Sequence, residues 1–161
     1  MDLSMELSVP SRPEYISIVR LVVSSLASAR RAVADERIDD LKLAVSEACT
    51  NAIEANRATG EDHPVVVTFW EGPERMEVCI RDFGAGFDPE VLPEHPPVTD
   101  PHRLNFERGL GIPLIKTLVD EARFESGESG TCARLTLFGG PATESGDETG
   151  EIVRVVTSEE T

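Results

Sequence analysis

The spacing of apolar residues differs between segments of the chain, and this difference constrains the fold more than any other feature. Over residues 41–53 the apolar positions recur three and four apart, as on one face of a helix: Leu41, Ala44, Val45, Ala48, Ala52 and Ile53. Residues 65–70 are β-branched and aromatic, and over residues 76–81 apolar and polar residues alternate. The sequence therefore predicts helices early in the chain and strands joined by short turns later.

The remaining segments complete this order. Residues 5–9 predict a short strand that ends at Pro10, and Ser11 with Glu14 resembles a capping box at the start of a helix that extends to about residue 33. Further expected elements are a helix over residues 39–56, a hairpin over 65–81, a helix from 111, and strands near 122–125 and 133–137. This order predicts an α+β fold, a two-layer sandwich with helices on one face of a mixed, mostly antiparallel sheet.

A chain of 161 residues fits one domain. We assign residues 1–138 to that domain. Residues 139–150 are small, polar and acidic, and Ile152, Val153, Val155 and Val156 follow them. We therefore expect residues 139–161 to form an acidic C-terminal tail or an extra edge strand.

The charge of the chain excludes some functions. Acidic residues outnumber basic ones 30 to 15, which gives a net charge of −15. This balance argues against direct binding to nucleic acid or to an anionic membrane, since both need clustered Lys and Arg. The N-terminus has no basic region, and no apolar run approaches the roughly 20 residues of a membrane helix. We expect a cytoplasmic protein.

The three cysteines, Cys49, Cys79 and Cys132, are odd in number and include no C-x-x-C pair. This count does not indicate a disulfide framework or a zinc site. We expect three unpaired, half-buried thiols in a reducing compartment.

Glu47 and Asn51 are four residues apart in the second expected helix, so their side chains project from the same face. A carboxylate can act as a base, and an amide oxygen suits Mg²⁺. An ordinary solvated helix face would show the same pattern.

Asp82 follows the second strand of the hairpin and precedes Gly84 and Gly86. Glycines allow a tight turn and a close approach to a ligand, while the carboxylate can accept a hydrogen bond from an exocyclic amine. Gly130 and Thr131 lie just before the last core strand. Each of these segments alone is equally compatible with an ordinary turn.

Arg108, Gly109 and Gly111 lie where the third helix begins. Free backbone N–H groups at a helix N-terminus bind anions, and a guanidinium can add a phosphate contact. Before them, residues 83–108 contain five prolines, Pro89, Pro93, Pro96, Pro97 and Pro101. So long an irregular stretch inside a small domain is typical of a functional or a disordered loop.

Together and in this order, the four segments resemble the N, G1, G2 and G3 boxes of the GHKL ATPase superfamily. The resemblance covers about residues 41–137 and implies a Bergerat-type ATP-binding fold. The stretches LKLAVSEACTNAIEAN, IRDFGAGFDP and RGLGIPLIKTLVDE are similar to the bacterial anti-sigma factor serine kinases of that superfamily.

The resemblance implies roles for the residues in the first two segments. Glu47 matches the general base, and Asn51 matches the ligand of Mg²⁺. Asp82 matches the acid that recognises the amino group of adenine. Gly84 and Gly86 match the turn beside the base.

It implies further roles for residues in the last two segments. Gly109 and Gly111 match the backbone that meets the phosphates of ATP, and Arg108 matches the basic residue before them. Thr131 matches a hydroxyl near the adenine. Residues 87–108 match a flexible lid over the nucleotide.

The implied function is an anti-sigma factor that also acts as an ATP-dependent serine/threonine protein kinase. It would be a homodimer that sequesters a sigma factor and phosphorylates an anti-sigma factor antagonist. A non-catalytic ATP-binding module is the alternative. The catalytic domain of a histidine kinase is disfavoured, because His63, His95 and His102 lie beside Pro or within the long loop. Many relatives carry His or another polar residue near residues 54–56, where this chain has Glu-Ala-Asn.

Overall fold

The computed structural model describes residues 3–30, 33–86, 111–139 and 151–156. The elements follow the order expected from the sequence. They are β1 (Leu3–Pro10), the 3-10 helix η1 (Pro13–Tyr15), α1 (Ile16–Arg30), α2 (Asp35–Thr59), β2 (Pro64–Glu71), β3 (Arg75–Arg81), α3 (Gly111–Leu118), β4 (Glu121–Gly127), β5 (Gly130–Phe138) and β6 (Glu151–Val156).

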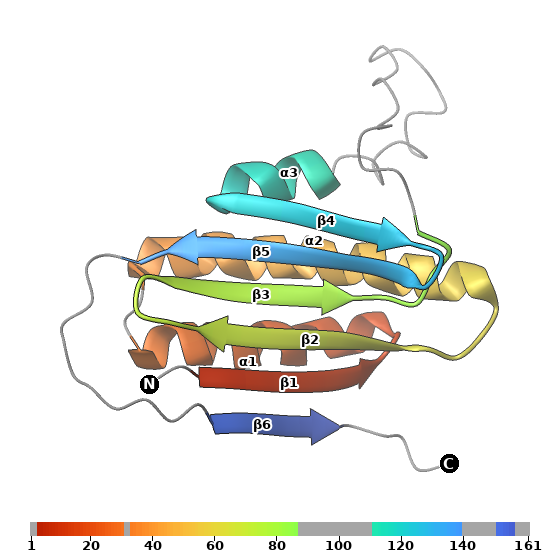
Figure 1. The fold of residues 1–161 in the computed structure, drawn as a ribbon, viewed down its shortest axis with the longest axis horizontal. Helices are drawn as coiled ribbons and strands as arrows, with labels where there is room; N and C mark the ends of the chain where they lie inside the picture. Colours follow the sequence, from red (N-terminus) through yellow and green to blue (C-terminus); the bar gives the residue numbers. More distant parts are fainter. Residues whose placement is uncertain (1–2, 31–32, 87–110, 140–150, 157–161) are drawn as a thin grey trace.

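The strands form one sheet with the order β4-β5-β3-β2-β1-β6. All neighbouring strands are antiparallel except β1 and β6, which are parallel. The helices lie on one side of this sheet, as Figure 1 shows. The structure thus confirms the predicted α+β sandwich with a mixed, mostly antiparallel sheet.

The core lies between the sheet and α1 and α2. In β2 the buried residues Val65, Val67 and Phe69 alternate with more exposed ones, so one face of the strand packs against the helices. Leu41 and Val45 of α2 are almost fully buried in the same core. The change of hydrophobic period in the sequence therefore corresponds to the two layers of the fold.

Helix α2 is longer than the expected residues 39–56. Asp35 and Glu36 lie in its first turn, where carboxylates stabilise the positive end of the helix dipole. The helix ends at Thr59, and the capping residue Gly60 has φ 73° and donates its N–H to the carbonyl of Arg57 at 3.2 Å. These two features extend the helix by about one turn at each end.

The expected capping box at the first helix is wrong. Arg12 occupies the cap position of η1 and makes no side-chain capping bond. The Ser11 hydroxyl instead donates to the carbonyl of His63 at 2.5 Å and accepts a hydrogen bond from Asn56 Nδ2 at 2.7 Å. A long-range partner therefore takes the hydroxyl that the local pattern assigned to the helix.

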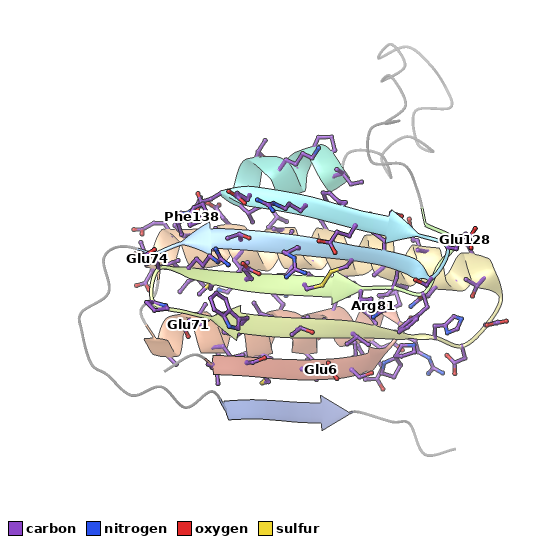
Figure 2. All side chains as sticks on the ribbon, viewed as in Figure 1. Glu6, Glu71, Glu74, Arg81, Glu128 and Phe138 are labelled. Carbon is purple, nitrogen blue, oxygen red and sulfur yellow. A yellow bond between two sulfur atoms is a disulfide. The ribbon has the colours of Figure 1, made fainter. Side chains whose placement is uncertain are left out.

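The expectation of three unpaired thiols is also wrong. Cys79 and Cys132 form a disulfide between β3 and β5, with their Cα atoms 6.1 Å apart. It lies on the sheet face away from the helices and is seen as a yellow bond in Figure 2. The residues are 53 apart in sequence, and only the strand topology brings them together. Cys49 is free, and burial raises the pKa of its thiol to about 12.

The structure describes one of the two remaining predicted segments and not the other. The loop of residues 87–108 lies outside the described residues. Strand β6 lies at the sheet edge beside β1. Among the described helices, none combines the length and the apolar character needed to cross a bilayer.

Candidate nucleotide-binding site

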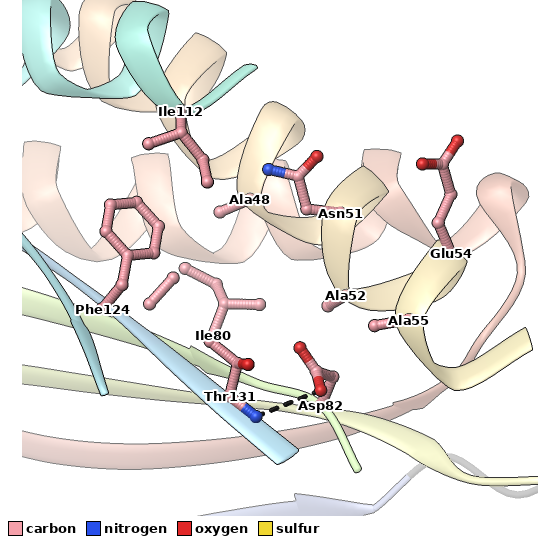
Figure 3. Close-up of a pocket in the computed structure, with 11 residues that line it drawn as sticks. Ala48, Asn51, Ala52, Glu54, Ala55, Ile80, Asp82, Ile112, Phe124 and Thr131 are labelled. Carbon is pink, nitrogen blue, oxygen red and sulfur yellow. Dashed lines mark hydrogen bonds between the residues drawn. The ribbon is translucent and has the colours of Figure 1, made fainter. Parts of the chain in front are cut away.

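A cavity of about 250 Å³ lies between α2, the start of α3, the end of β3, the middle of β4 and the start of β5. Its walls are mostly apolar, and Figure 3 shows the side chains that face it. The polar residues in the lining are Asn51, Glu54, Asp82 and Thr131. An apolar pocket with a few convergent polar groups is the usual form of a small-molecule site.

Asp82 lies immediately after β3 and is only 6% exposed. Its Oδ1 accepts hydrogen bonds from the backbone N–H groups of Gly84 at 2.9 Å and of Thr131 at 3.1 Å. Burial raises the pKa of this carboxyl, and the two backbone bonds lower it by less. Because both donors reach Oδ1, Oδ2 is placed to accept a hydrogen bond from a ligand.

Thr131 lies opposite Asp82 at the start of β5. The backbone N–H of Asp82 donates to the carbonyl of Thr131 at 2.9 Å, so the two residues are bonded in both directions. The Thr131 hydroxyl lies 2.9 Å from that of Ser126 in β4. The structure therefore brings the second and fourth sequence segments together at one end of the cavity.

Glu47 and Asn51 meet the first residue of α3. A Cβ atom placed on Gly111 would lie 3.3 Å from both Asn51 Nδ2 and Glu47 Oε2. The backbone at the start of α3 thus packs directly against both side chains, and glycine allows this approach. The first and third segments therefore come together, and of these three residues only Asn51 lines the cavity.

Gly84 and Gly86 also lie where backbone and neighbours approach closely. A Cβ on Gly84 would lie 2.9 Å from the Cβ of Ala55 in α2. Gly86 has φ 80°, and a Cβ there would lie 2.5 Å from the carbonyl oxygen of Gly127. At these two positions the turn after Asp82 therefore fits against α2 and the β4–β5 turn only without a side chain.

Arg108 and Gly109 lie outside the described residues. The expected phosphate contacts of these two residues are therefore predictions from the sequence. Gly111 is the member of this segment whose position the structure describes.

Several lining residues were not recognised as site residues from the sequence. Ile80, Ile112 and Phe124 form apolar walls, and Ala55 lies beside Asp82 (Figure 3). One signal was present: alanines at 48, 52 and 55 recur at helical spacing on α2 and leave room beside the sheet. Nothing in the local sequence of Phe124 distinguishes it from a core residue.

The donor groups fit a Mg²⁺ ion that is held mainly by phosphate. Among the residues that the structure describes, no cluster of three or more His, Cys, Asp or Glu side chains is present. Mg²⁺ commonly keeps several waters and takes few protein ligands in addition to substrate phosphates. The amide of Asn51, beside the backbone at Gly111, suits such a single ligand.

Comparison with known proteins identifies the family of the chain. Residues 9–137 match the model of the histidine kinase-like ATPase domain. The chain is 40% identical to "Serine-protein kinase RsbW" of Bacillus pumilus, over 83% of this chain and 85% of that protein. It is 38% identical to the protein of the same name from Bacillus subtilis, over 83% and 84%.

A solved structure also shares the fold. The crystal structure of the RsbU and RsbW domains of a Mycobacterium tuberculosis protein has a TM-score of 0.59 at 22% identity, over 86% of this chain and 33% of that one. The chain therefore belongs to the histidine kinase-like ATPase family and, within it, to the serine-protein kinases called RsbW.

Proposed function

We propose that this chain is an anti-sigma factor with ATP-dependent serine/threonine protein kinase activity. One observation carries the proposal: Glu47 and Asn51 lie against Gly111 at the start of α3, and Asn51 lines the cavity that Asp82 also lines. In this proposal a potential base and a potential metal ligand lie beside backbone N–H groups that would bind phosphate. Relatives at 40% and 38% identity are serine-protein kinases.

The apolar cavity would hold the adenine of ATP. Ile80, Ile112 and Phe124 offer surfaces for the flat ring, and Asp82 would accept a hydrogen bond from the amino group. The Thr131 hydroxyl lines the same end. A buried carboxylate favours a base that donates over one that presents a carbonyl oxygen, because two facing acceptors would leave the carboxylate unsatisfied.

The phosphates would extend from the cavity toward Glu47 and α3. The free N–H groups at the start of α3 would bind phosphate oxygens, with Gly109 and Arg108 adding further contacts. Asn51 would hold Mg²⁺, which neutralises charge on the transferring phosphoryl group. Glu47 would orient and deprotonate the serine or threonine hydroxyl of the protein substrate.

The protein substrate in this proposal is an anti-sigma factor antagonist, and the other partner is a sigma factor in the cytoplasm. We also propose a homodimer. Ile18 and Leu21 of α1 support a protein interface, because they are 42% and 66% exposed although both are large and apolar. The net charge of −15 supports protein partners rather than nucleic acid.

The test is transfer of labelled γ-phosphate from ATP with Mg²⁺ to candidate antagonist proteins. We expect transfer by the wild type and a loss of at least about 100-fold in Glu47→Gln, as for removal of a general base. Glu36→Gln is the matched control, because Glu36 is exposed in the first turn of the same helix. It should transfer phosphate at the wild-type rate.

The outcomes separate the two functional classes. Undiminished transfer by Glu47→Gln would remove Glu47 from the mechanism. A wild-type protein that binds ATP but phosphorylates no antagonist would favour the non-catalytic binding module. Absence of ATP binding would contradict the site itself.

A further inference from the structure

The segment after Asp82 is attached to the last turns of α2 through one buried side chain. Asn56 of α2 is 1% exposed. Its Oδ1 accepts a hydrogen bond from the backbone N–H of Phe83 at 2.7 Å. Because Phe83 directly follows Asp82, this bond fixes the backbone one residue beyond the carboxylate.

The other end of the Asn56 amide is bonded as well. Nδ2 donates to the Ser11 hydroxyl at 2.7 Å and to the carbonyl of Pro64 at 3.0 Å. Oδ1 faces an N–H donor while Nδ2 faces acceptors, so these partners specify one orientation of the amide. Asn56 therefore connects the turn after β3 to the end of β1 and the start of β2.

The neighbours of Asp82 are also fixed by packing. The Phe83 ring stacks on His63 with ring centroids 5.5 Å apart, and the guanidinium of Arg81 lies 5.2 Å from the centre of the same ring. Gly84, whose N–H donates to Asp82 Oδ1, packs against Ala55, the residue before Asn56. The end of α2 thus determines where the carboxylate and one of its donors lie.

We propose that Asn56 is a positioning residue that sets the preference of the site for adenine. This inference rests on the proposed function, in which Asp82 accepts a hydrogen bond from the adenine amino group. Hydrogen bonds weaken steeply when distance and angle depart from their optimum. Loss of the Asn56 bond to Phe83 would shift the carboxylate and weaken this one contact, without changing contacts to ribose and phosphate.

The experiment compares two nucleotides that differ only in the amino group. Dissociation constants of the full chain for ATP and for purine riboside triphosphate, with Mg²⁺, are measured by titration calorimetry. For Asn56→Ala we expect ATP to bind about tenfold more weakly and the analogue to change by less than about twofold, because the lost bond involves a charged acceptor. The preference for ATP would then largely disappear.

Thr59→Ala is the matched control. The Thr59 hydroxyl donates to the carbonyl of Asn56 at 2.7 Å, at the same end of α2, and does not touch the Asn56 amide. This variant loses two hydrogen bonds of the helix end, the one to the Asn56 carbonyl and the one that the Thr59 hydroxyl accepts from the backbone N–H of Glu61 at 3.1 Å. It should keep the wild-type ratio of the two dissociation constants. A general loosening of the helix end would instead reduce the preference for ATP over the analogue in both variants, and that outcome would overturn the proposal.

Two further measurements distinguish a failure of the proposed role of Asn56 from a failure of the proposed adenine contact of Asp82. Asp82→Asn should itself abolish the preference for ATP. A preference lost in Asp82→Asn but kept in Asn56→Ala would overturn the role of Asn56 alone, whereas a preference kept in Asp82→Asn would overturn the proposed adenine contact and this inference with it.

The second measurement does not depend on whether Asn56→Ala folds. Hydrogen exchange of the free wild-type chain should show the Phe83 amide protected about as well as the Ile80 amide within β3. Fast exchange at Phe83 would mean that its bond to Asn56 does not persist, and would overturn the proposal.

Discussion

The backbone N–H of Thr131 donates a 3.1 Å hydrogen bond to Oδ1 of Asp82, so the start of β5 determines where the carboxylate after β3 lies. This bond favours the charged carboxylate, while burial in an apolar cavity favours the neutral form and raises the pKa. The charged form of Asp82 is therefore less favourable in the folded protein than in the unfolded chain.

Replacement of Asp82 by Asn should weaken the binding of ATP. In Asp82→Asn the amide oxygen can still accept the bonds from Gly84 and Thr131, but the amide nitrogen faces the amino group of adenine as a second donor. We expect ATP to bind about 10- to 100-fold more weakly, in line with a lost bond to a charged group. Titration calorimetry gives the affinity. Unchanged ATP affinity would contradict the assigned role of Asp82.

The same variant should change how stability depends on pH. Because burial raises the pKa of Asp82 in the folded state above its ordinary value, the folded state binds more protons than the unfolded state between the unfolded and the folded pKa. The contribution of Asp82 to the free energy of unfolding therefore decreases as pH rises through that window, and is constant above it.

Urea unfolding of the free proteins from pH 4 to 8 measures this effect. The free energy of unfolding of Asp82→Asn, minus that of the wild type, should increase with pH and then level off. A difference that decreases with rising pH would mean that the folded pKa is lowered rather than raised.

A methyl group at Gly111 should disturb Glu47 and Asn51 together. At 3.3 Å from polar atoms of both side chains, the added Cβ requires them to move by a few tenths of an ångström. We expect Gly111→Ala to reduce phosphate transfer by at least about tenfold, since small misplacements of reacting groups are costly. Gly127→Ala is the control, because a Cβ there has no atom within 4 Å. Equal rates in the two variants would contradict this reading of the site.

Gly130 should be far less tolerant of substitution than Gly60. Both have positive φ, of 116° and 73°, but a Cβ on Gly130 would overlap the carbonyl oxygen of Asp82, whereas one on Gly60 meets nothing within 4 Å. We expect Gly60→Ala to cost about 1 kcal/mol and Gly130→Ala more than about 3 kcal/mol. Chemical denaturation measures both, and similar costs would show that the overlap is relieved by a small backbone shift.

Local patterns predicted the fold because each has a local cause. The apolar stripe from Leu41 to Ile53 and the alternation around Val78 follow directly from the periods of helix and strand. The roles of Ser11 and Asn56 were not predictable in this way, because the bond between them spans 45 residues. The capping pattern around Ser11 is a local alternative that the tertiary contact replaces.

The same distinction applies to the site. Glu47, Asn51 and Asp82 are predicted as site residues because their types and spacing, together with the glycines, resemble a known order of motifs. That order does not specify which apolar residues form the walls, since Phe124 and Ile80 have the same pattern as any inward-facing strand residue. Their place in the cavity depends on the strand order β4-β5-β3, which single-strand patterns do not contain.

The disulfide between Cys79 and Cys132 can be tested by counting thiols. In denaturant, the chain purified without reductant should show one reactive thiol, from Cys49, and three after reduction. The crosslink closes a loop between residues 53 apart, so its reduction should lower the free energy of unfolding by up to about 4 kcal/mol in the loop-entropy description. The double variant Cys79→Ser/Cys132→Ser should lose this sensitivity to reductant. Three thiols before reduction would show that the two cysteines are unpaired in solution, and reductant would then leave the unfolding midpoint unchanged.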